Sequence, residues 1–261
     1  MATTLRAEPA LQPDAHATAP DAASARSYSL QIVPPGPEAE LALRLRYRVF
    51  AEEMGARLAA QAGRDVDEWD AHCEHLMVRD DHTGDVVGTY RIFPPRAAAR
   101  LGRSYSSTEF DLDGLRGIGD SLVEVGRSCV DPAHRNGAVV SLLWSGLARY
   151  MLLSGHRYLG GCASIYLDAG KGNAAAIVRE ALATHAGPEH LAVTPHTPWH
   201  YDKYPEPVRV SVPPLLRAYL RLGAKVLGEP SYDPGFHTAD LYILLDMQSV
   251  DPRVTKRFTG R

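Results

Sequence analysis

The sequence has little of the features that would narrow its function at once. It has three cysteines, an odd number without regular spacing, which argues against a disulfide framework and for a reducing compartment. Its formal net charge is only -3, with an isoelectric point near 6.4, so nothing favours nucleic acid as a partner. No apolar run approaches the roughly 20 residues that span a bilayer. Any contact with a membrane is therefore expected to be peripheral.

The first 27 residues also lack large apolar side chains. Residues 1–27 are rich in alanine, proline and small polar residues, which predicts a disordered tail. The segment has no continuous apolar stretch of the kind found in a secretory signal. The chain as a whole has 261 residues and is 45% apolar, enough for a sizeable core. The last residues, 247–261, are polar and basic and are expected to form a second tail.

Apolar periodicity predicts the elements between the two tails. We expect strands over 28–33, 75–80, 86–93, 122–130, 158–165, 225–227 and 240–245. We expect helices over 38–54, 105–115, 139–151, 173–183 and 213–223. On the first of these helices, Leu41, Leu45, Val49 and Phe50 recur on or near one face.

The stretch 122–147 reads as a buried strand that runs through a glycine-containing turn into an apolar helix. Two charged residues, Glu124 and Arg127, interrupt the apolar pattern of the strand, and a charge in such a strand needs a reason. The free N–H groups at the start of the following helix, beside Arg135, form a natural seat for a phosphate.

An acidic cluster with one aromatic residue occupies positions 65–70 (DVDEWD). It can be a solvated loop of charged residues. It can also bind a cationic amino acid, because an ammonium group that leaves water must be paired with a carboxylate. The two interpretations carry about equal weight on the residues alone.

Two groups of histidines look like metal sites, but neither has suitable spacing. In His72–His75 the potential ligands are too close for a standard zinc site, and no second half follows. His196 and His200 are four residues apart, but Pro195 and Pro198 prevent the helix that would bring them onto one face. We therefore expect no metal.

Several longer stretches resemble one family. They are LRYRVFAEEMGA, DEWDAHCEHLMVRD, VVGTYRIFPP, EVGRSCVDPAHR, LLWSGLARYML, GCASI and PPLLRAYLRLGAKVLGEPSYDPGF. Together they are similar to the ornithine acyl-carrier-protein N-acyltransferases that make lyso-ornithine lipid, within the GNAT superfamily of N-acyltransferases. They are similar, more distantly, to the acyl-homoserine-lactone synthases. The resemblance covers roughly residues 28–246.

The resemblance implies a three-layer α/β (α+β) GNAT fold. It predicts a mixed, mostly antiparallel, twisted sheet of about seven strands, flanked by helices and followed by a C-terminal extension. The fourth and fifth strands splay apart in this fold, and the pantetheine arm of the acyl donor enters between them. Gly160 and Gly161 would permit that close approach, and Cys162 beside them is expected to be a small packing residue.

The resemblance also assigns residues to the acyl donor and the substrate. The loop that binds the donor phosphopantetheine corresponds to Arg135, Asn136, Gly137 and Ala138, although His134 and Val139 depart from its consensus. Substrate-binding positions of the lactone synthases correspond to the residues that follow. They are Arg46 and Phe50 of an Arg-x-x-x-Phe element, the acidic pair Asp67 and Asp70, and Arg91 of a Gly-x-x-Arg element.

Glu124 and Arg127 are the predicted catalytic residues. Glu124 matches the proposed base of the lactone synthases, and its partly apolar strand would raise its pKa. Arg127 matches their Glu-x-x-Arg pairing, and it would orient Glu124 or bind a substrate carboxylate. A bulge at Gly126 would let the two act together, and its N–H groups would polarise the thioester. Arg91 is expected to pair with Glu124 or with the acidic cluster, and a purely structural ion pair stays open.

The function implied by the resemblance is transfer of a long 3-hydroxyacyl chain from acyl-carrier protein to the α-amine of L-ornithine. The reaction would take place in the cytoplasm and release lyso-ornithine lipid at the membrane surface. The donor carries its acyl group on 4'-phosphopantetheine, so we expect no separate cofactor. The alternatives are N-acylation of another amino acid, synthesis of a homoserine-lactone-type signal, and a non-catalytic GNAT-like lipid-binding protein.

Overall fold

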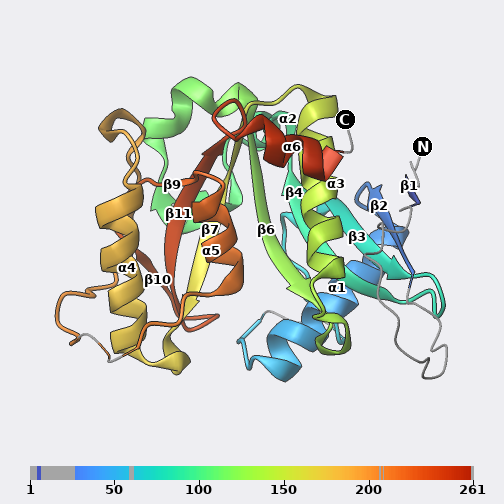
Figure 1. The fold of residues 1–261 in the computed structure, drawn as a ribbon, viewed down its shortest axis with the longest axis horizontal. Helices are drawn as coiled ribbons and strands as arrows, with labels where there is room; N and C mark the ends of the chain where they lie inside the picture. Colours follow the sequence, from blue (N-terminus) through green and yellow to red (C-terminus); the bar gives the residue numbers. More distant parts are fainter. Residues whose placement is uncertain (1–4, 7–26, 59–61, 206, 208, 260–261) are drawn as a thin grey trace, which may run out of the picture.

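A computed structural model describes residues 5–6, 27–58, 62–205, 207 and 209–259. Its centre is a nine-stranded sheet in the order β1-β2-β3-β4-β6-β7-β11-β10, with β9 also paired to β11 (Figure 1). The strands are β1 (Leu5–Arg6), β2 (Tyr28–Val33), β3 (Glu74–Asp80), β4 (Val86–Phe93), β6 (Leu122–Val130), β7 (Tyr158–Tyr166), β9 (Lys225–Val226), β10 (Ser231–Asp233) and β11 (Thr238–Asp246). All seven predicted strands are present, and the short β1 and β10 extend the sheet.

The sheet is antiparallel except where β6 meets β7, which are parallel. These two strands have nine residues each, but they pair only at their beginnings, over Leu122–Glu124 and Tyr158–Gly160. Beyond that point they diverge (Figure 1). The splayed strands expected of a GNAT fold are therefore confirmed. A Cβ atom on Gly161 would lie 2.2 Å from the carbonyl oxygen of Val125, so only glycine fits at the point of divergence.

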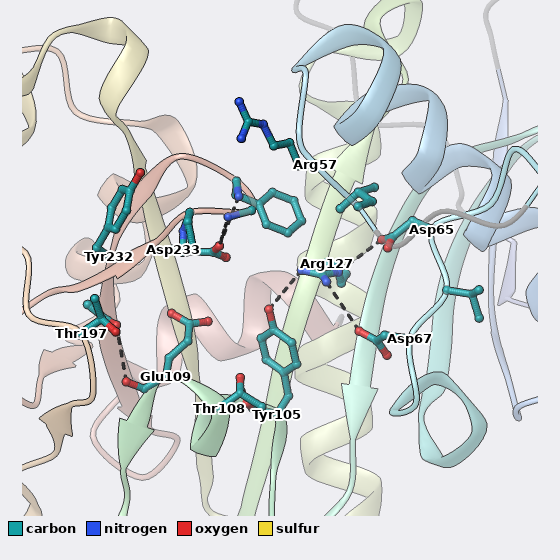
Figure 2. A pocket seen from close by; sticks show the side chains of 16 residues that line it. Arg57, Asp65, Asp67, Tyr105, Thr108, Glu109, Arg127, Thr197, Tyr232 and Asp233 are labelled. Carbon is teal, nitrogen blue, oxygen red and sulfur yellow. Dashed lines mark hydrogen bonds and ion pairs between the residues drawn. The ribbon is translucent and has the colours of Figure 1, made fainter.

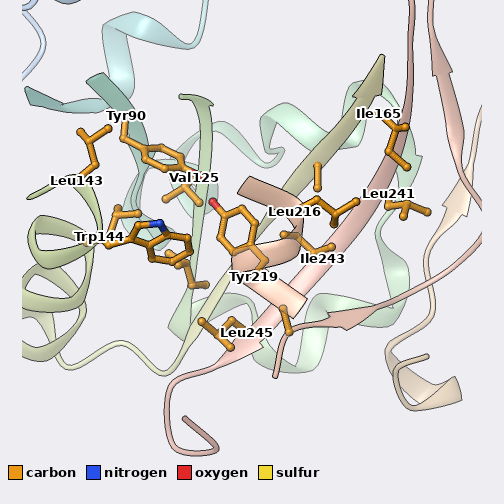
Figure 3. Packing of buried hydrophobic residues seen from close by; sticks show 14 of the residues in the cluster. Tyr90, Val125, Leu143, Trp144, Ile165, Leu216, Tyr219, Leu241, Ile243 and Leu245 are labelled. Carbon is orange, nitrogen blue, oxygen red and sulfur yellow. The ribbon is translucent and has the colours of Figure 1, made fainter. Parts of the chain in front are cut away.

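One face of the sheet packs against four helices. These are α3 (Ala138–Ser154), α4 (Lys171–His185), α5 (Pro214–Arg221) and α6 (Pro252–Thr259). Figure 3 shows Trp144 of α3 beside Tyr219 of α5, over Val125, Ile243 and Leu245 of the sheet. The two aromatic rings meet edge to face with centroids 4.9 Å apart. Helix α5 thus covers the region where β6 and β7 part.

Helix α6 was not predicted, because its sequence is mostly polar. Val254 and Phe258 nevertheless lie four residues apart, on one side of the helix, and pack against the main apolar core. Phe258 also stacks on Trp144. The expected N-terminal tail lies mostly outside the described residues. Within it, Leu5 and Arg6 pair with Leu30 and Ser29 as strand β1.

The opposite face of the sheet carries helix α1 (Glu40–Tyr47), which continues as one π-helical segment, Arg48–Glu53. Leu45, Val49 and Phe50 are buried against the sheet, as expected. Leu41 is 40% exposed, so its predicted place on the buried face was wrong.

The segment 105–115, predicted to be a short helix with its turns, contains no α-helix. The segment forms a short 3-10 helix (Tyr105–Thr108), then strand β5 (Phe110–Asp111), then a second 3-10 segment (Asp113–Ser121). The hydroxyl groups of Ser107 and Thr108 donate hydrogen bonds to backbone carbonyls three residues earlier, which competes with α-helix formation. Strand β5 pairs with β8 (Thr194–Pro195) and forms a small second sheet.

One further helix, α2 (Pro95–Leu101), follows β4. Among the described residues, we find no helix with the length and apolar character needed to cross a bilayer.

Candidate active site

A pocket of about 370 Å³ opens between the two halves of the molecule on the α1 side of the sheet (Figure 2). One wall comes from Arg57 and Leu58, from residues 65–67 and from Arg127 of β6. The other wall comes from residues 105–109 and from the turn 231–236, which begins in β10. Of the predicted site residues, Asp67 and Arg127 line this pocket.

Behind the first wall, Arg46 holds two aspartates. Its side chain is fully buried, its Nε donates to Asp65 at 2.8 Å, and its two terminal nitrogens donate to Asp70 at 2.6 and 3.1 Å. Burial alone would raise the pKa of Asp70, but Arg46 and Arg91 lower it far below its usual value. Asp70 is therefore an ionised structural partner behind the wall, and it does not line the pocket.

Arg91 of β4 pairs with the same acidic cluster. Its Nη1 donates to both oxygens of Asp67 at 2.7 Å and to Asp70 at 3.3 Å. The prediction that this buried arginine meets a carboxylate is confirmed, and the partner is the acidic cluster. Arg91 is 3% exposed and Phe50 is 5% exposed, so both support the wall from behind. The ring of Phe50 meets that of Phe236, which lines the pocket, edge to face at 5.5 Å.

Arg127 reaches the pocket through a β-bulge. Thr89 pairs with Cys129 and Arg91 pairs with Gly126, so β6 has one more residue than β4 between these two pairs. The extra residue falls at positions 127–128, because Gly126 itself keeps its partner, and the bulge predicted at Gly126 is displaced by about one residue. Arg127 adopts φ +50°, in the left-handed region.

The bulge sets the side chain of Arg127 between several groups. Its guanidinium lies 3.2 Å from Asp65 and 3.5 Å from Asp67, and it donates to the hydroxyl of Tyr105 at 3.2 Å. It also lies over the ring of Phe236, 4.6 Å from the ring centroid. These contacts hold one positive charge at the pocket surface.

Glu124 is buried beneath the pocket and does not line it. Its Oε1 accepts hydrogen bonds from the backbone N–H of Ser106 at 2.7 Å and from its hydroxyl at 2.6 Å. Burial raises the pKa of Glu124, and the hydrogen bonds from Ser106 partly oppose that shift. The same hydroxyl lies 3.3 Å from the sulfur of Cys162. Sequence reasoning missed Ser106, because it was placed on a helix that does not form.

The second wall of the pocket was also missed. Glu109, Tyr105 and Asp233 line it. Glu109 is the residue between the 3-10 helix and β5, and the carboxylate of Asp233 accepts from the backbone N–H of Gly235 at 2.6 Å. The turn around Asp233 and Gly235 lies in a stretch, SYDPGF, that carries the family resemblance. That stretch was the one available signal.

The predicted donor loop lies at the start of α3. Arg135 makes two hydrogen bonds to Glu53, at 2.6 and 2.7 Å, and the side-chain oxygen of Asn136 accepts from the N–H of Ala138 at 3.1 Å. Gly137 has φ +89°, a conformation that glycine adopts without strain. The loop has the predicted form, and its binding of phosphopantetheine stays a prediction.

Within the described ranges, one group of three potential metal ligands comes together: Glu109, Cys162 and Asp240. The histidines considered from the sequence are not part of it. The expectation that the protein needs no metal stays a prediction.

Comparison with known proteins gives the family. Residues 45–145 match the acetyltransferase (GNAT) domain family. An L-ornithine N(alpha)-acyltransferase of Rhizobium meliloti is 37% identical over 234 residues, which cover 83% of this chain and 79% of that protein. An enzyme of the same name from Rhodobacter capsulatus is 34% identical over 259 residues, 92% of this chain and 98% of that protein.

Solved structures show the same fold. A CoA-dependent acyl-homoserine lactone synthase, solved with SAM and isopentyl-CoA, superposes with a TM-score of 0.54 at 16% identity, over 88% of each chain. The AHL synthase LasI also gives 0.54, at 13% identity, over 90% of this chain and 96% of that one. From the matched domain, the splayed strands and the identity to these relatives, the chain belongs to the L-ornithine N(alpha)-acyltransferase family and has the GNAT fold.

Proposed function

We propose that this protein transfers a long-chain (3-hydroxy)acyl group from acyl-carrier protein to the α-amine of L-ornithine, giving lyso-ornithine lipid. The relatives named L-ornithine N(alpha)-acyltransferase, at 33–37% identity, support the acceptor and the reaction. One structural observation carries the proposal: a pocket with charges of both signs lies beside the splayed strands β6 and β7. An amino acid is a zwitterion, and such a pocket suits it.

Arg127 is the proposed partner of the ornithine carboxylate. Arg57 and Arg127 both line the pocket, and Arg127 is the one beside Asp67. A guanidinium fork matches a carboxylate in geometry. Tyr105 and Phe236 fix its orientation through a hydrogen bond and ring contacts. These groups are held in position before the substrate binds, which lowers the entropic cost of positioning the substrate.

The chemistry requires removal of a proton from the α-ammonium group, because only the neutral amine attacks a thioester. The amine nitrogen then forms a bond to the carbonyl carbon, the carbon–sulfur bond breaks, and the thiol of the carrier leaves with a proton. Glu124 is the proposed base. Neither Glu124 nor Ser106, whose hydroxyl lies 2.6 Å from it, lines the pocket. We therefore infer that the proton reaches Glu124 through Ser106 after crossing the wall that residues 105–109 form.

The acyl chain would lie on the other side of the splay, under α5 and α6. Two small apolar cavities, of about 10 and 30 Å³, share Leu159 and Leu245 there. They are too small for a long chain, so α6 must shift to admit it. Leu152 and Leu153, near the end of α3, are 55% and 85% exposed, which supports peripheral contact with a membrane during product release.

The test is thiol release from 3-hydroxyacyl-carrier protein with the purified chain, across a panel of free amino acids. We expect turnover with ornithine, and we expect Glu124→Gln to lower it by about 100-fold or more. Glu189→Gln, at an exposed position remote from the pocket, is the matched control. Acyl-CoA in place of the carrier tests the donor. Turnover confined to another amino acid would reject ornithine, and no turnover with any acceptor would reject the acyltransferase proposal.

A further inference from the structure

Three polar side chains meet beneath the second wall of the pocket. Val123 and Val125 of β6, Ala163 of β7 and Leu241 of β11 point into the core under α3, so their neighbours in sequence point the other way. Cys162 and Asp240 are therefore on the pocket side of the sheet. Their sulfur and carboxylate oxygen atoms, together with an oxygen of Glu109, all lie within 4.8 Å of one another.

The two carboxyl groups of this cluster have no cationic partner among the described residues. Neither Glu109 nor Asp240 takes part in any ion pair found there. The buried oxygens of Glu109 and Oδ1 of Asp240 have no charged partner, and the two carboxyl groups rely on hydrogen bonds to each other and to neutral groups such as Cys162; Asp240 is only 3% exposed. Two buried carboxyl groups that pair with each other share a proton, and a cation brought by a ligand can take the place of that proton.

The groups around the cluster add more negative charge to it. Asp233 of β10 lines the pocket beside Glu109, and its charge raises the pKa of both Glu109 and Asp240. Burial is the largest cause of both shifts. The other titratable neighbours include Cys162, Tyr105 and Tyr166, whose own pKa values burial raises, so all three stay neutral. Arg127 stands on the opposite wall, where it contacts Asp65 and Asp67.

We propose that Glu109 and Asp240, with Asp233 beside them, form the subsite for the side-chain ammonium group of a dibasic acceptor. The inference rests on the proposed function and names the residues that select ornithine. Figure 2 shows the geometry: Glu109 and Asp233 face the pocket from one side and Arg127 from the other. With the carboxylate of the amino acid on Arg127, its side-chain ammonium extends toward Glu109. The two ends of the substrate are then fixed, and its α-amine lies between them.

The same three groups could also bind a divalent metal ion, which would displace the proton of the Cys162 thiol. The chelator treatment below distinguishes a metal from the ammonium group that we propose. Two carboxyl groups, one of them lining the pocket, are sufficient to pair with a single positive charge that comes with the substrate.

The experiment compares ornithine with L-norvaline, which has the same three-carbon side chain but no ammonium group. Product formation from 3-hydroxyacyl-carrier protein is followed by mass spectrometry for wild type, Glu109→Gln and Asp240→Asn. We expect each variant to lower kcat/KM for ornithine by about 100-fold and to leave that for norvaline unchanged. Asp113→Asn, at an exposed position, is the control and should change neither.

The outcomes separate this inference from the proposed function. If wild type acylates ornithine and both variants lower kcat/KM for ornithine and norvaline equally, the residues contribute to the reaction and not to the choice of substrate. The subsite is then rejected. If prior treatment with a chelator abolishes ornithine acylation, the cluster holds a metal, and the subsite is again rejected. If wild type acylates neither amino acid, the proposed function fails. The subsite is then tested by a measurement of amino-acid binding alone.

Binding is measured by titration calorimetry in two buffers with different ionisation enthalpies. Near pH 7, ornithine should release a proton from the carboxyl pair of wild type on binding, whereas norvaline should not. Glu109→Gln should abolish the release, and thermal melting shows whether each variant is folded. Equal affinity of folded wild type for ornithine and norvaline would overturn the subsite.

Discussion

On one wall of the pocket, Asp65, Asp67 and Asp70 face three guanidinium groups, whereas on the other wall Glu109 and Asp240 face no cation among the described residues. The first set is held by hydrogen bonds as short as 2.6 Å. The carboxyl groups of the second set pair only with each other and with neutral groups. Both walls are acidic in sequence, yet only the second leaves carboxyl groups that no cation of the described residues neutralises.

The difference shows that the number of carboxylates does not locate a cation site. The acidic cluster 65–70 was the stronger candidate from the sequence, but most of its charge is consumed by Arg46, Arg91 and Arg127. These pairs shape the wall and hold Arg127 in place. Glu109 and Asp240 are separated by 131 positions in the chain and form a site only in the folded protein.

We expect the largest effect on stability from a substitution that removes the buried ion pairs behind the first wall. Arg46→Ala removes the partner of two buried carboxylates, so we expect it to lower the free energy of unfolding by about 3–5 kcal/mol. Arg44→Ala, on the same helix but 55% exposed and paired only with Glu40, should cost less than about 1 kcal/mol. Urea denaturation at neutral pH measures both. Equal losses would show that the first wall is not held by its buried pairs.

The raised pKa of Glu109, on the second wall, should make the stability of the protein depend on pH. Burial raises the pKa of Glu109 from 4.5 to about 9 in the folded protein. A raised pKa means that the folded state binds more protons between these values, so stability is fully present below pH 4.5 and is lost as the pH rises toward 9.

Glu109→Gln removes this dependence. We expect the variant to be more stable than wild type by about 1–3 kcal/mol near pH 9, with little difference near pH 5. Chemical denaturation at both pH values measures the difference, with Glu68→Gln at an exposed site as the control. If the variant and wild type differ in free energy of unfolding by the same amount at both pH values, a partner already compensates the charge of Glu109.

The smallest effect tests whether the first wall also selects the substrate. Asp67 lines the pocket but is paired with Arg91 and Arg127. Asp67→Asn should lower kcat/KM for ornithine and norvaline together, because it disturbs Arg127, and should leave their ratio within about twofold of wild type. A ratio that falls as far as in Glu109→Gln would make Asp67 an ammonium ligand, as first predicted, and would remove the contrast between the walls.

Local patterns in the sequence predicted most of the fold. Every residue of β4 is buried, and its run of apolar and β-branched residues is visible in one short window. The bulge in β6 was misplaced because it depends on register with β4, which no local pattern encodes. Helix α6 was missed although Val254 and Phe258 carry the helical spacing, because the polar residues around them dominated the composition.

The site was less predictable than the fold. The charges of Glu124, Arg127 and Arg91 stood out because they interrupt apolar strands. Their partners did not, since Ser106 and Glu109 come from a segment whose turns are set by side-chain hydrogen bonds and by pairing with β8. A charged residue in a strand can therefore be recognised from the sequence, whereas its interaction partner is determined by the tertiary structure.

The short pairing between β6 and β7 has a mechanical consequence. Among the described residues, β6 and β7 share only three residue pairs. The other links between the parts of the molecule on either side of this seam are side-chain packing, the β5–β8 pair and a few hydrogen bonds, such as that from the N–H of Arg57 to the carbonyl of Gly235. Pulled from its two ends in an optical trap, the protein should part first along this line, at a force well below that needed to shear β7 from β11, which share nine pairs. Extension in a single step, without such an intermediate, would contradict this. The seam at which we propose that the pantetheine arm enters is thus a weak line in the middle of the sheet.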